Sequence, residues 1–225
     1  MEIGELVGTG RTADVFALDD GRVLRRYRDG ADGTGELAVM AHLAEHGYPV
    51  PAVWPGEAAN ELVMERLSGV TMRQALTDGT IAPERAGEMS AELLRRLHTV
   101  PARLSANPGD RVLHLDFHPE NVMLTAEGPI VIDWATTAEG PPGLDSAMTA
   151  LILAQAAVTM PAVAAVARAV LTPLVRHLGS IDETHLAAAR ARRAANPTLS
   201  REEVDRLDDA MALIRSAGTS TPRRR

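Results

Sequence analysis

The stretch from Val112 to Trp134, VLHLDFHPENVMLTAEGPIVIDW, constrains the fold of this chain more than any other stretch. It contains two short apolar runs, Val122–Leu124 and Ile130–Ile132, joined by a turn that contains Gly128-Pro129. Short apolar runs around a Gly-Pro break predict a β-hairpin. A polar loop precedes this hairpin and Asp133 follows it, so we expect polar groups at its two ends to converge.

Three groups in this stretch, Asp116, Asn121 and Asp133, suit phosphoryl transfer. That reaction needs an acceptor for the proton of a hydroxyl group, and oxygen ligands for the Mg²⁺ that neutralises a triphosphate. In kinases, an H-x-D-x-x-x-x-N string and a later Asp supply these groups. Mg²⁺ takes a few protein oxygens and leaves the rest of its shell to phosphates and water. Each residue alone also fits a turn, but the complete string favours catalysis.

The segments HLDFHPEN and VIDW resemble the aminoglycoside phosphotransferase family, the small-molecule branch of the protein-kinase-like fold. The resemblance extends in motif order from Leu6 to Asp145. It implies an α+β, two-lobed chain with a small antiparallel-sheet N-lobe over residues 1–66. A mainly helical C-lobe would follow over residues 67–218, and residues 219–225 would form a disordered tail.

The resemblance also implies the reaction: ATP- and Mg²⁺-dependent phosphorylation of a hydroxyl group on a small molecule, aminoglycoside-like or another metabolite. Asp116 would be the base, and Asn121 and Asp133 the Mg²⁺ ligands. His118 stands where related protein kinases carry a lysine near the γ-phosphate. It either contacts phosphate or pins the loop.

A glycine-rich turn near the N-terminus is a candidate for nucleotide binding. The segment Leu6–Leu18, LVGTGRTADVFAL, predicts a strand, a turn and a second strand. Gly8 and Gly10 permit a close approach of the backbone to a ligand. The string matches G-x-G-x-x-G-x-V except that Ala13 replaces the third glycine. Such a loop can offer N–H groups to phosphates, and a plain hairpin is the alternative.

The segment Arg22–Tyr27 predicts a third strand, which in the kinase-like pattern carries a phosphate-binding lysine. Arg25 occupies that position, and the chain has no lysine, since all 23 of its Lys+Arg residues are arginines. The arginine either keeps the charge or marks lost catalysis, because guanidinium and ammonium are not interchangeable. Glu36 lies in the first turn of a helix predicted to begin at Thr34 or Gly35 and to run to His46. Its alternatives are an ion pair with Arg25 and a favourable position at a helix N-terminus.

The segment Glu61–Gly69, ELVMERLSG, resembles the hinge between kinase lobes. The resemblance implies that Met64 lines the back of the adenine pocket. The backbone carbonyl of Glu65 and the N–H of Leu67 would bind the adenine edge. An ordinary buried strand that leads into a loop is the alternative.

The remaining segments predict helices by their apolar spacing. Asp145, at the start of one of them, either props the catalytic loop, as the resemblance implies, or is an N-cap or first-turn acid of the helix. The Ala/Leu/Val-rich run from Ala147 to Val175 is interrupted by Gln155, Pro161 and Arg168, so it predicts two buried helices and no membrane span. The predicted helices cover Thr71–Thr77, Ala82–His98, Ser146–Met160, a segment after Pro161, Asp182–Ala195 and Ser200–Ser216.

Charge and composition limit the classes of binding partner that this chain can have. The formal net charge of −7 disfavours nucleic acid and anionic membranes, and it suits a cationic acceptor such as an aminoglycoside. Cysteine is absent, which excludes disulfides and a cysteine-ligated zinc site. The acidic N-terminal segment shows no signal peptide, so we expect a cytoplasmic protein.

Two other functions fit parts of this sequence. A kinase relative with weak or no catalysis would bind nucleotide in a regulatory or scaffolding role, and Arg25 and Ala13 favour it. A transferase of a different group, such as a nucleotidyl transferase, would release pyrophosphate instead of ADP.

Overall fold

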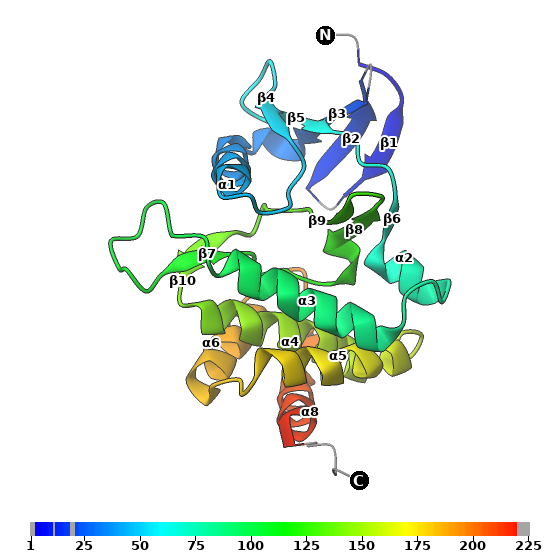
Figure 1. The fold of residues 1–225 in the computed structure, drawn as a ribbon, viewed down its shortest axis with the longest axis vertical. Helices are drawn as coiled ribbons and strands as arrows, with labels where there is room; N and C mark the ends of the chain where they lie inside the picture. The colour runs from blue at the N-terminus through cyan, green and yellow to red at the C-terminus, as the bar shows by residue number, and fades with distance from the viewer. Residues whose placement is uncertain (1–2, 11, 19–20, 220–225) are drawn as a thin grey trace. The chain divides into compact units, whose positions relative to one another are not determined.

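The computed structural model describes residues 3–10, 12–18 and 21–219 (Figure 1). The chain divides into two compact units. The first comprises Met1–Thr71 and Asn121–Thr137, and the second comprises Met72–Glu120 and Ala138–Arg225. This division differs from the predicted one in two places: the first segment ends at Thr71 instead of residue 66, and the 121–137 segment groups with the N-terminal unit. Most of the predicted tail, residues 220–225, lies outside the described residues.

The first unit contains a five-stranded antiparallel sheet in the order β1-β2-β3-β5-β4. Helix α1, Thr34–Glu45, buries Met40 and Leu43, whereas Ala41 and Ala44, which also fitted its apolar spacing, are exposed. Ala13, Tyr27 and Leu62 form part of the core. The strands are β1 (Leu6–Thr9), β2 (Ala13–Ala17), β3 (Arg22–Tyr27), β4 (Val53–Pro55) and β5 (Glu61–Glu65), and a short 3₁₀ turn, η1 (Arg28–Gly30), follows β3.

A second sheet of this unit contains the predicted hairpin. Strands β6 (Val70–Thr71), β8 (Val122–Thr125) and β9 (Gly128–Val131) are antiparallel in that order. The hairpin is confirmed, but its turn lies at residues 126–127, and Gly128-Pro129 belong to β9. Thr125 pairs with Gly128, which closes a two-residue turn. Pro129 is tolerated because β9 is an edge strand and needs no N–H on its open side.

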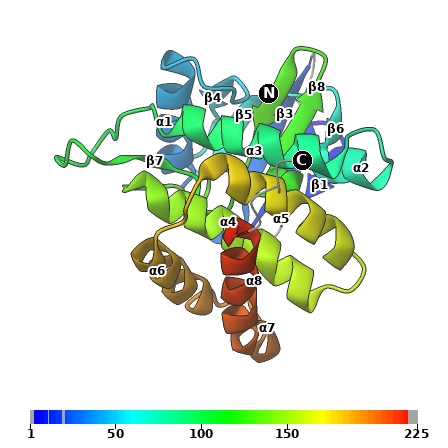
Figure 2. The same ribbon diagram turned by 60° about the horizontal axis from the view of Figure 1, so that its bottom comes forward.

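The second unit is a helical assembly around α4, which contacts α5, α6 and α8 (Figure 2). Helix α4 is buried on almost every side, as its apolar sequence requires. It begins at Pro142, earlier than predicted, because a proline fits the first helical position without losing a hydrogen bond. The helices are α2 (Met72–Thr77), α3 (Pro83–Leu97), α4 (Pro142–Thr159), α5 (Ala164–Leu178), α6 (Glu183–Ala194), α7 (Arg201–Asp205) and α8 (Leu207–Thr219).

Short elements complete the second unit. Strands β7 (Arg111–Leu113) and β10 (Ala138–Gly140) pair antiparallel, and neither was predicted. The 3₁₀ turn η2 (Pro119–Asn121) ends the loop after β7. The helix predicted from Ser200 to Ser216 is divided at Arg206 into α7 and α8. Its predicted start is confirmed by a capping box between Ser200 and Glu203.

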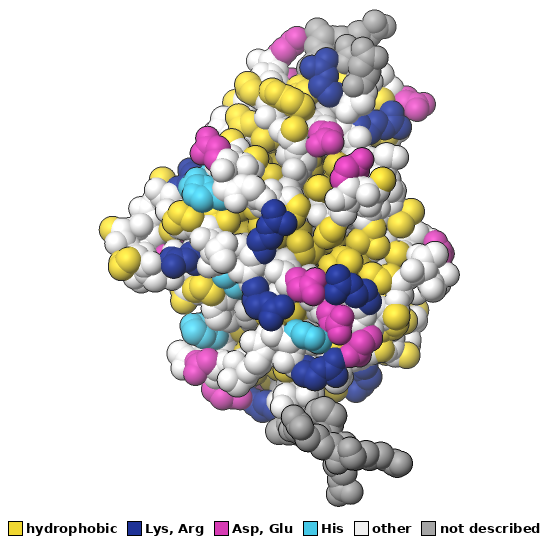
Figure 3. All heavy atoms as spheres, viewed as in Figure 1, with side chains coloured by type: hydrophobic (Ala, Val, Ile, Leu, Met, Phe, Trp, Pro, Cys, Tyr) yellow, Lys and Arg dark blue, Asp and Glu magenta, His cyan; other side chains and the backbone are white. Residues whose placement is uncertain are grey.

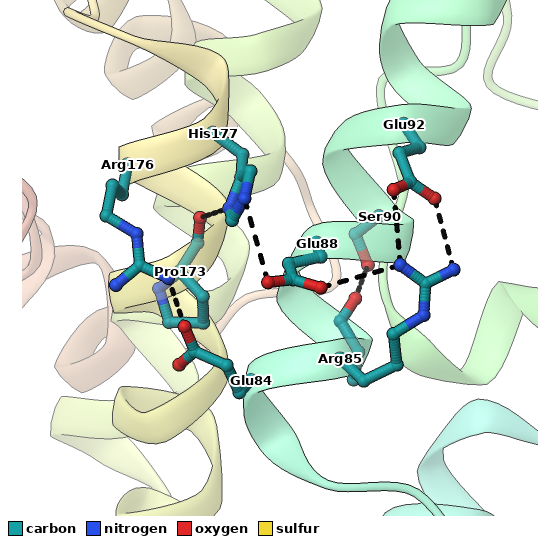
Figure 4. Close-up of polar contacts among 9 residues, drawn as sticks. Glu84, Arg85, Glu88, Ser90, Glu92, Pro173, Arg176 and His177 are labelled. Carbon is teal, nitrogen blue, oxygen red and sulfur yellow. Dashed lines mark hydrogen bonds and ion pairs between the residues drawn. The ribbon is translucent and has the colours of Figure 1, made fainter.

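Helices α3 and α5 pack closely because Gly87 faces α5. A Cβ at Gly87 would lie 2.6 Å from the carbonyl oxygen of Val170 and 2.6 Å from Cγ of Pro173. Acidic and basic side chains alternate on the surface over these two helices (Figure 3). Glu84 pairs with Arg176, and Arg85 pairs with Glu92 (Figure 4). The Arg85 Nη1 lies 3.1 Å from Oε1 of Glu92. Such exposed pairs each contribute about 0–1 kcal/mol, so the apolar contact dominates the packing.

No helix in the described ranges combines the length and the apolar character needed to cross a bilayer.

Candidate active site

Arg25 is the centre of a charged cluster in the first unit. Its Nη1 lies 3.1 Å from Oε1 of Glu36, and its Nη2 lies 2.9 Å from Oδ1 of Asp133. Strand alternation turns Arg26 the other way, where its Nη2 lies 2.7 Å from Glu61 Oε1. The ion pair between Arg25 and Glu36 that the resemblance implies is thus present. The assignment of both residues to phosphate binding stays a prediction.

Glu36 is almost completely buried, with 3% of its side chain exposed. Burial raises the pKa of Glu36 and outweighs the Arg25 guanidinium, which lowers it, while the charge of Asp133 raises it further. The backbone N–H of Trp134 donates to Oε1 at 3.2 Å. Oε2 accepts no hydrogen bond from any described residue. The cluster therefore contains a buried carboxylate of which only one oxygen, Oε1, is hydrogen-bonded by the described residues.

Trp134 anchors the far end of the hairpin. Its indole N–H donates to the carbonyl oxygen of Val131 at 3.1 Å, and its ring meets the Tyr48 ring edge-on, with centroids 5.7 Å apart. The N–H of Val131 donates to the carbonyl of Pro49 at 2.8 Å. These contacts hold Asp133 against the segment that follows α1.

Asn121 and Asp133 lie at adjacent ends of β8 and β9. The N–H of Ile132 donates to the backbone carbonyl of Asn121 at 3.0 Å, which extends the hairpin pairing by one residue at this end. The Asp133 side chain is 44% exposed, so its carboxylate is open to a ligand. One carboxylate and one amide oxygen fit Mg²⁺, which takes most of its ligands from phosphates and water. Among the residues that the structure describes, no three His, Cys, Asp or Glu side chains form a metal-binding group.

Asp116, the candidate base, belongs to the second unit and lies in the loop after β7. The His118 Nε2 lies 3.6 Å from its Oδ2, and the Arg193 Nη1 lies 3.9 Å from its Oδ1. Burial tends to raise the pKa of Asp116, but the hydrogen bond and charge of His118 and the charges of Arg193 and His114 lower it on balance. The carboxylate is therefore ionised near neutral pH, as a proton acceptor must be.

Asp145 holds this loop in place through hydrogen bonds to its backbone. Its carboxylate accepts hydrogen bonds from the N–H groups of His114 at 3.0 Å and Leu115 at 2.8 Å, and His98 Nε2 lies 3.1 Å from it. Burial tends to raise the pKa of Asp145, yet the hydrogen bonds and the charges of His98 and His114 lower it. The N-cap of α4 is Pro141, so Asp145 is not the N-cap, but it does lie in the first turn of α4, as the alternative also allowed. From that position its carboxylate also binds the catalytic loop, as the resemblance implies.

Two non-glycine residues in the described part of the chain have left-handed backbone angles, and each lies at a candidate group. Leu115, with φ +62°, precedes Asp116, and Asp133 itself has φ +64°. Such angles cost of order 1–3 kcal/mol and cluster at functional sites. No sequence pattern indicated this strain.

The remaining predicted nucleotide contacts lie on the first sheet. Gly8 and Gly10 flank the β1–β2 turn, in which the N–H of Gly10 donates to the carbonyl of Ala13 at 2.8 Å. Arg11, in the same turn, lies outside the described residues. Their roles stay predictions.

The predicted adenine contacts lie at the end of β5 and just after it. Met64 packs against the core and Glu65 ends the strand. The N–H of Arg66 donates to the carbonyl of Gly21 at 2.7 Å, which ties the following segment to the sheet. The N–H of Leu67 donates to no residue that the structure describes, as a contact to a ligand would require.

Arg193 and Gln155 were not predicted as site residues. Leu186, Ala189 and Arg193 follow the i, i+3, i+7 spacing of the buried face of α6, so an arginine stands where an apolar residue is expected. The Arg193 Nε donates to Oε1 of Gln155 at 2.7 Å. Gln155 was noted only as a polar interruption of an apolar run. Each is a polar residue at a position where the sequence pattern predicts an apolar one, and this departure was the signal that could have identified them.

Comparisons with known proteins identify the family and the fold. The model of the phosphotransferase enzyme family matches residues 4–113 and 101–179. A choline/ethanolamine kinase family protein from Mesorhizobium loti is 17% identical, with a TM-score of 0.56 over 99% of this chain and 89% of that chain. Aminoglycoside phosphotransferase APH(2'')-Ib, in an ADP-bound structure, is 13% identical, with a TM-score of 0.58 over 97% of this chain and 94% of that chain.

A third solved structure is aminoglycoside phosphotransferase APH(4)-Ia in a ternary complex with ADP and hygromycin B. It is 15% identical, with a TM-score of 0.55 over 97% of this chain and 96% of that chain. At these identities the likeness shows the fold alone, and it confirms the predicted protein-kinase-like, two-lobed α+β fold. A search of curated proteins finds no match.

Proposed function

This chain belongs to the phosphotransferase enzyme family, and we propose that it transfers the γ-phosphoryl group of ATP, in the presence of Mg²⁺, to a hydroxyl group of a small molecule. The observation that supports this most is the contact of one arginine, Arg25, with both Glu36 and Asp133. A cation that forms ion pairs with a buried glutamate and with the proposed metal-ligating aspartate suits a nucleoside triphosphate, because such a site binds phosphate and Mg²⁺ next to each other.

In this proposal the first unit binds the nucleotide. Arg25 binds phosphate oxygens, the turn that contains Gly8 and Gly10 offers N–H groups, and the segment from Met64 to Leu67 binds adenine. Asn121 and Asp133 hold Mg²⁺, which when bound neutralises charge on the transferring phosphate.

Asp116 orients the acceptor hydroxyl and accepts its proton. The hydroxyl oxygen forms a bond to the γ-phosphorus as the bond from phosphorus to the β–γ bridging oxygen breaks, and ADP leaves. The lowered pKa of Asp116 keeps the carboxylate ionised for this step. Asp145 acts through the loop: by binding two consecutive N–H groups just before Asp116, it fixes the direction of that side chain.

The test is Asp116→Asn, which keeps the size of the side chain and removes the proton acceptor. We expect ADP release with an acceptor to fall by about 10²- to 10⁴-fold, with ATP affinity retained. The matched control is Asp205→Asn, which removes a carboxylate from an exposed position on α7 and should leave both quantities unchanged. Undiminished turnover in Asp116→Asn would remove Asp116 from the mechanism.

A second candidate function is nucleotide binding without turnover. The contact of Arg25 with Oδ1 of Asp133 favours it, because the guanidinium engages a carboxylate that the metal needs. Assays of ATP binding and ADP release by the wild-type protein distinguish the two functions. A protein that only binds nucleotide would bind ATP and release no ADP with any acceptor.

A further inference from the structure

Gln155 is a buried amide on an otherwise apolar stretch of α4. Its neighbours from Ala150 to Ala157 are all alanine, leucine or isoleucine, and Gln155 itself is 3% exposed. A buried amide costs free energy unless it is hydrogen-bonded. Its Oε1 accepts a hydrogen bond from Nε of Arg193 at 2.7 Å. Because two apolar side chains could replace such a pair at little cost, folding alone does not explain it.

The pair connects two helices with the loop that contains the candidate base. Arg193 lies in the last turn of α6, and α6 packs against α4 (Figure 2). Nε is the nitrogen nearest to the arginine stem, so the hydrogen bond to Gln155 holds that stem in place. The Nη1 of the same guanidinium lies 3.9 Å from Oδ1 of Asp116. A side chain fixed by α4 therefore lies against the base.

The carboxylate of Asp116 has a basic group beside each of its oxygens. His118 Nε2 lies 3.6 Å from Oδ2, and Arg193 Nη1 lies 3.9 Å from Oδ1. His118 belongs to the same loop as Asp116, whereas Arg193 belongs to a packed helix outside it. Opposite charges at about 4 Å attract each other. The attraction draws Oδ1 toward α6 and opposes rotation of the carboxylate.

Another arginine of α6 has a different kind of contact. Arg190 binds Asp208 with two nitrogens, at 2.6 and 3.1 Å, in an exposed ion pair that joins α6 to α8. Its contact connects one helix to another, whereas the contacts of Arg193 include a candidate catalytic group. The two arginines therefore allow the effect of a charge on α6 to be separated from an effect on Asp116.

We propose that Arg193 is a positioning residue of the phosphoryl transfer, which sets the direction of the Asp116 carboxylate, and that Gln155 holds Arg193 in place for this role. The inference rests on the proposed phosphotransferase function and adds two side chains outside the catalytic loop on which the reaction depends. Asp116 must direct one oxygen at the acceptor hydroxyl, so a small rotation of its carboxylate lowers the rate of transfer. Arg193 therefore contributes to kcat and not to the affinity for ATP.

Arg193→Met tests this role, because it keeps an unbranched stem and removes the guanidinium. We measure ADP release from ATP with Mg²⁺, with water and with kanamycin as acceptors. The kcat should fall about 10- to 100-fold, the cost of a misplaced reacting group, and the KM for ATP should stay within about twofold. Arg193→Lys should recover part of the kcat because it keeps the charge. The controls Arg192→Met, at an exposed neighbouring position, and Arg190→Met should keep the wild-type kcat.

Two double variants separate positioning from folding. In Asp116→Asn the carboxylate is already absent, so the addition of Arg193→Met should change kcat no further. The variant Gln155→Met with Arg193→Met replaces both partners by apolar side chains and leaves no unpaired buried amide. Its midpoint of urea denaturation should stay close to that of wild type, while its kcat should be as low as that of Arg193→Met.

Several results would overturn the proposal while leaving the phosphotransferase function in place. They are a wild-type kcat in Arg193→Met, an equal loss of kcat in Arg192→Met, and a further loss when Arg193→Met is added to Asp116→Asn. A kcat that falls only where the urea midpoint also falls would assign both residues to packing instead. A wild-type protein that releases no ADP with water or kanamycin would overturn the proposed function and this inference together.

Discussion

At position 25 an arginine makes a connection that a lysine could not make in the same way. The two outer nitrogens of Arg25 reach different carboxylates, Glu36 and Asp133, whereas a lysine has a single nitrogen to share. The substitution is therefore more than a side effect of a lysine-free composition. It couples the buried end of α1 to the end of the hairpin that carries Asp133, the proposed metal ligand, through one rigid, planar group.

Removal of this group has two expected effects. Arg25→Ala should weaken ATP binding, because the phosphate-binding cation is lost. It should also lower the free energy of unfolding by about 1–3 kcal/mol, because the buried Glu36 loses its charged partner. Calorimetric titration with ATP and urea denaturation measure the two effects.

The matched control is Arg26→Ala, on the other face of β3. Arg26 is 40% exposed and pairs with Glu61, so the loss of unfolding free energy should stay within about 1 kcal/mol. An ATP affinity of Arg25→Ala equal to that of wild type would exclude Arg25 from the nucleotide site.

At the scale of elements, α3 and α5 depend on a residue with no side chain. Gly87→Ala should destabilise the protein by about 1–3 kcal/mol, because the new Cβ meets backbone atoms of α5 that have no room to move. Gly35→Ala, in α1, is the opposite case, since no atom lies within 4 Å of its Cβ position. It should stabilise the protein by about 0.5–1 kcal/mol through helix propensity. Urea denaturation of both variants checks the pair, and equal effects would contradict the packing argument.

The first turn of α4 makes stability depend on pH. The folded pKa of Asp145 is lowered, so its contribution is fully present above the ordinary carboxyl pKa of about 3.9 and is lost as the pH falls through the folded value. Asp145→Asn should cost about 1.5–3 kcal/mol at pH 7, because two N–H groups and His98 lose an ionised acceptor.

The informative measurement is the difference in unfolding free energy between wild type and Asp145→Asn across pH 2 to 7. That difference should shrink as the pH falls below about 4. Asp205→Asn, at an exposed position, should show a small difference that does not change with pH. A constant difference for Asp145→Asn would mean that the cost comes from packing and not from the charge.

At the scale of the whole molecule, the order of motifs along the chain was enough to predict the fold. Strand β3 was predicted at its observed limits, and the hairpin strands β8 and β9 within two residues, because glycine turns and β-branched runs mark them. Strand β6 was not predicted, since its two residues carry no strand pattern and Thr71 was assigned to a helix. Asp145 could not be assigned from sequence, since a carboxylate at the start of a helix fits an N-cap, a first-turn acid and a prop for the loop equally well. Arg193 and Gln155 were missed because their meeting depends on how α4 packs against α6, and no local pattern encodes that contact.

Binding of nucleotide should be visible in the stability of the whole protein. ATP with Mg²⁺ at about a hundred times its Kd adds roughly 2.7 kcal/mol to the folded state. For a chain of this length we expect a rise in Tm of roughly 5 to 10 °C. The shift should depend on Mg²⁺ and should fall in Asp133→Asn, which removes the charged metal ligand. A shift of equal size without Mg²⁺ would argue against the site formed by Asn121 and Asp133.

The first unit is assembled from two stretches of chain, and this affects how the protein is made. Strand β6 ends at Thr71, yet its partner β8 and the Asp133 that pairs with Arg25 are not synthesised until after residue 121. A ribosome adds about 5–20 residues per second, so the nascent N-terminal segment waits several seconds for its missing strand. During that interval β6 lacks its partner strand and Arg25 lacks Asp133, so the first unit can complete its fold only after the second stretch has been made.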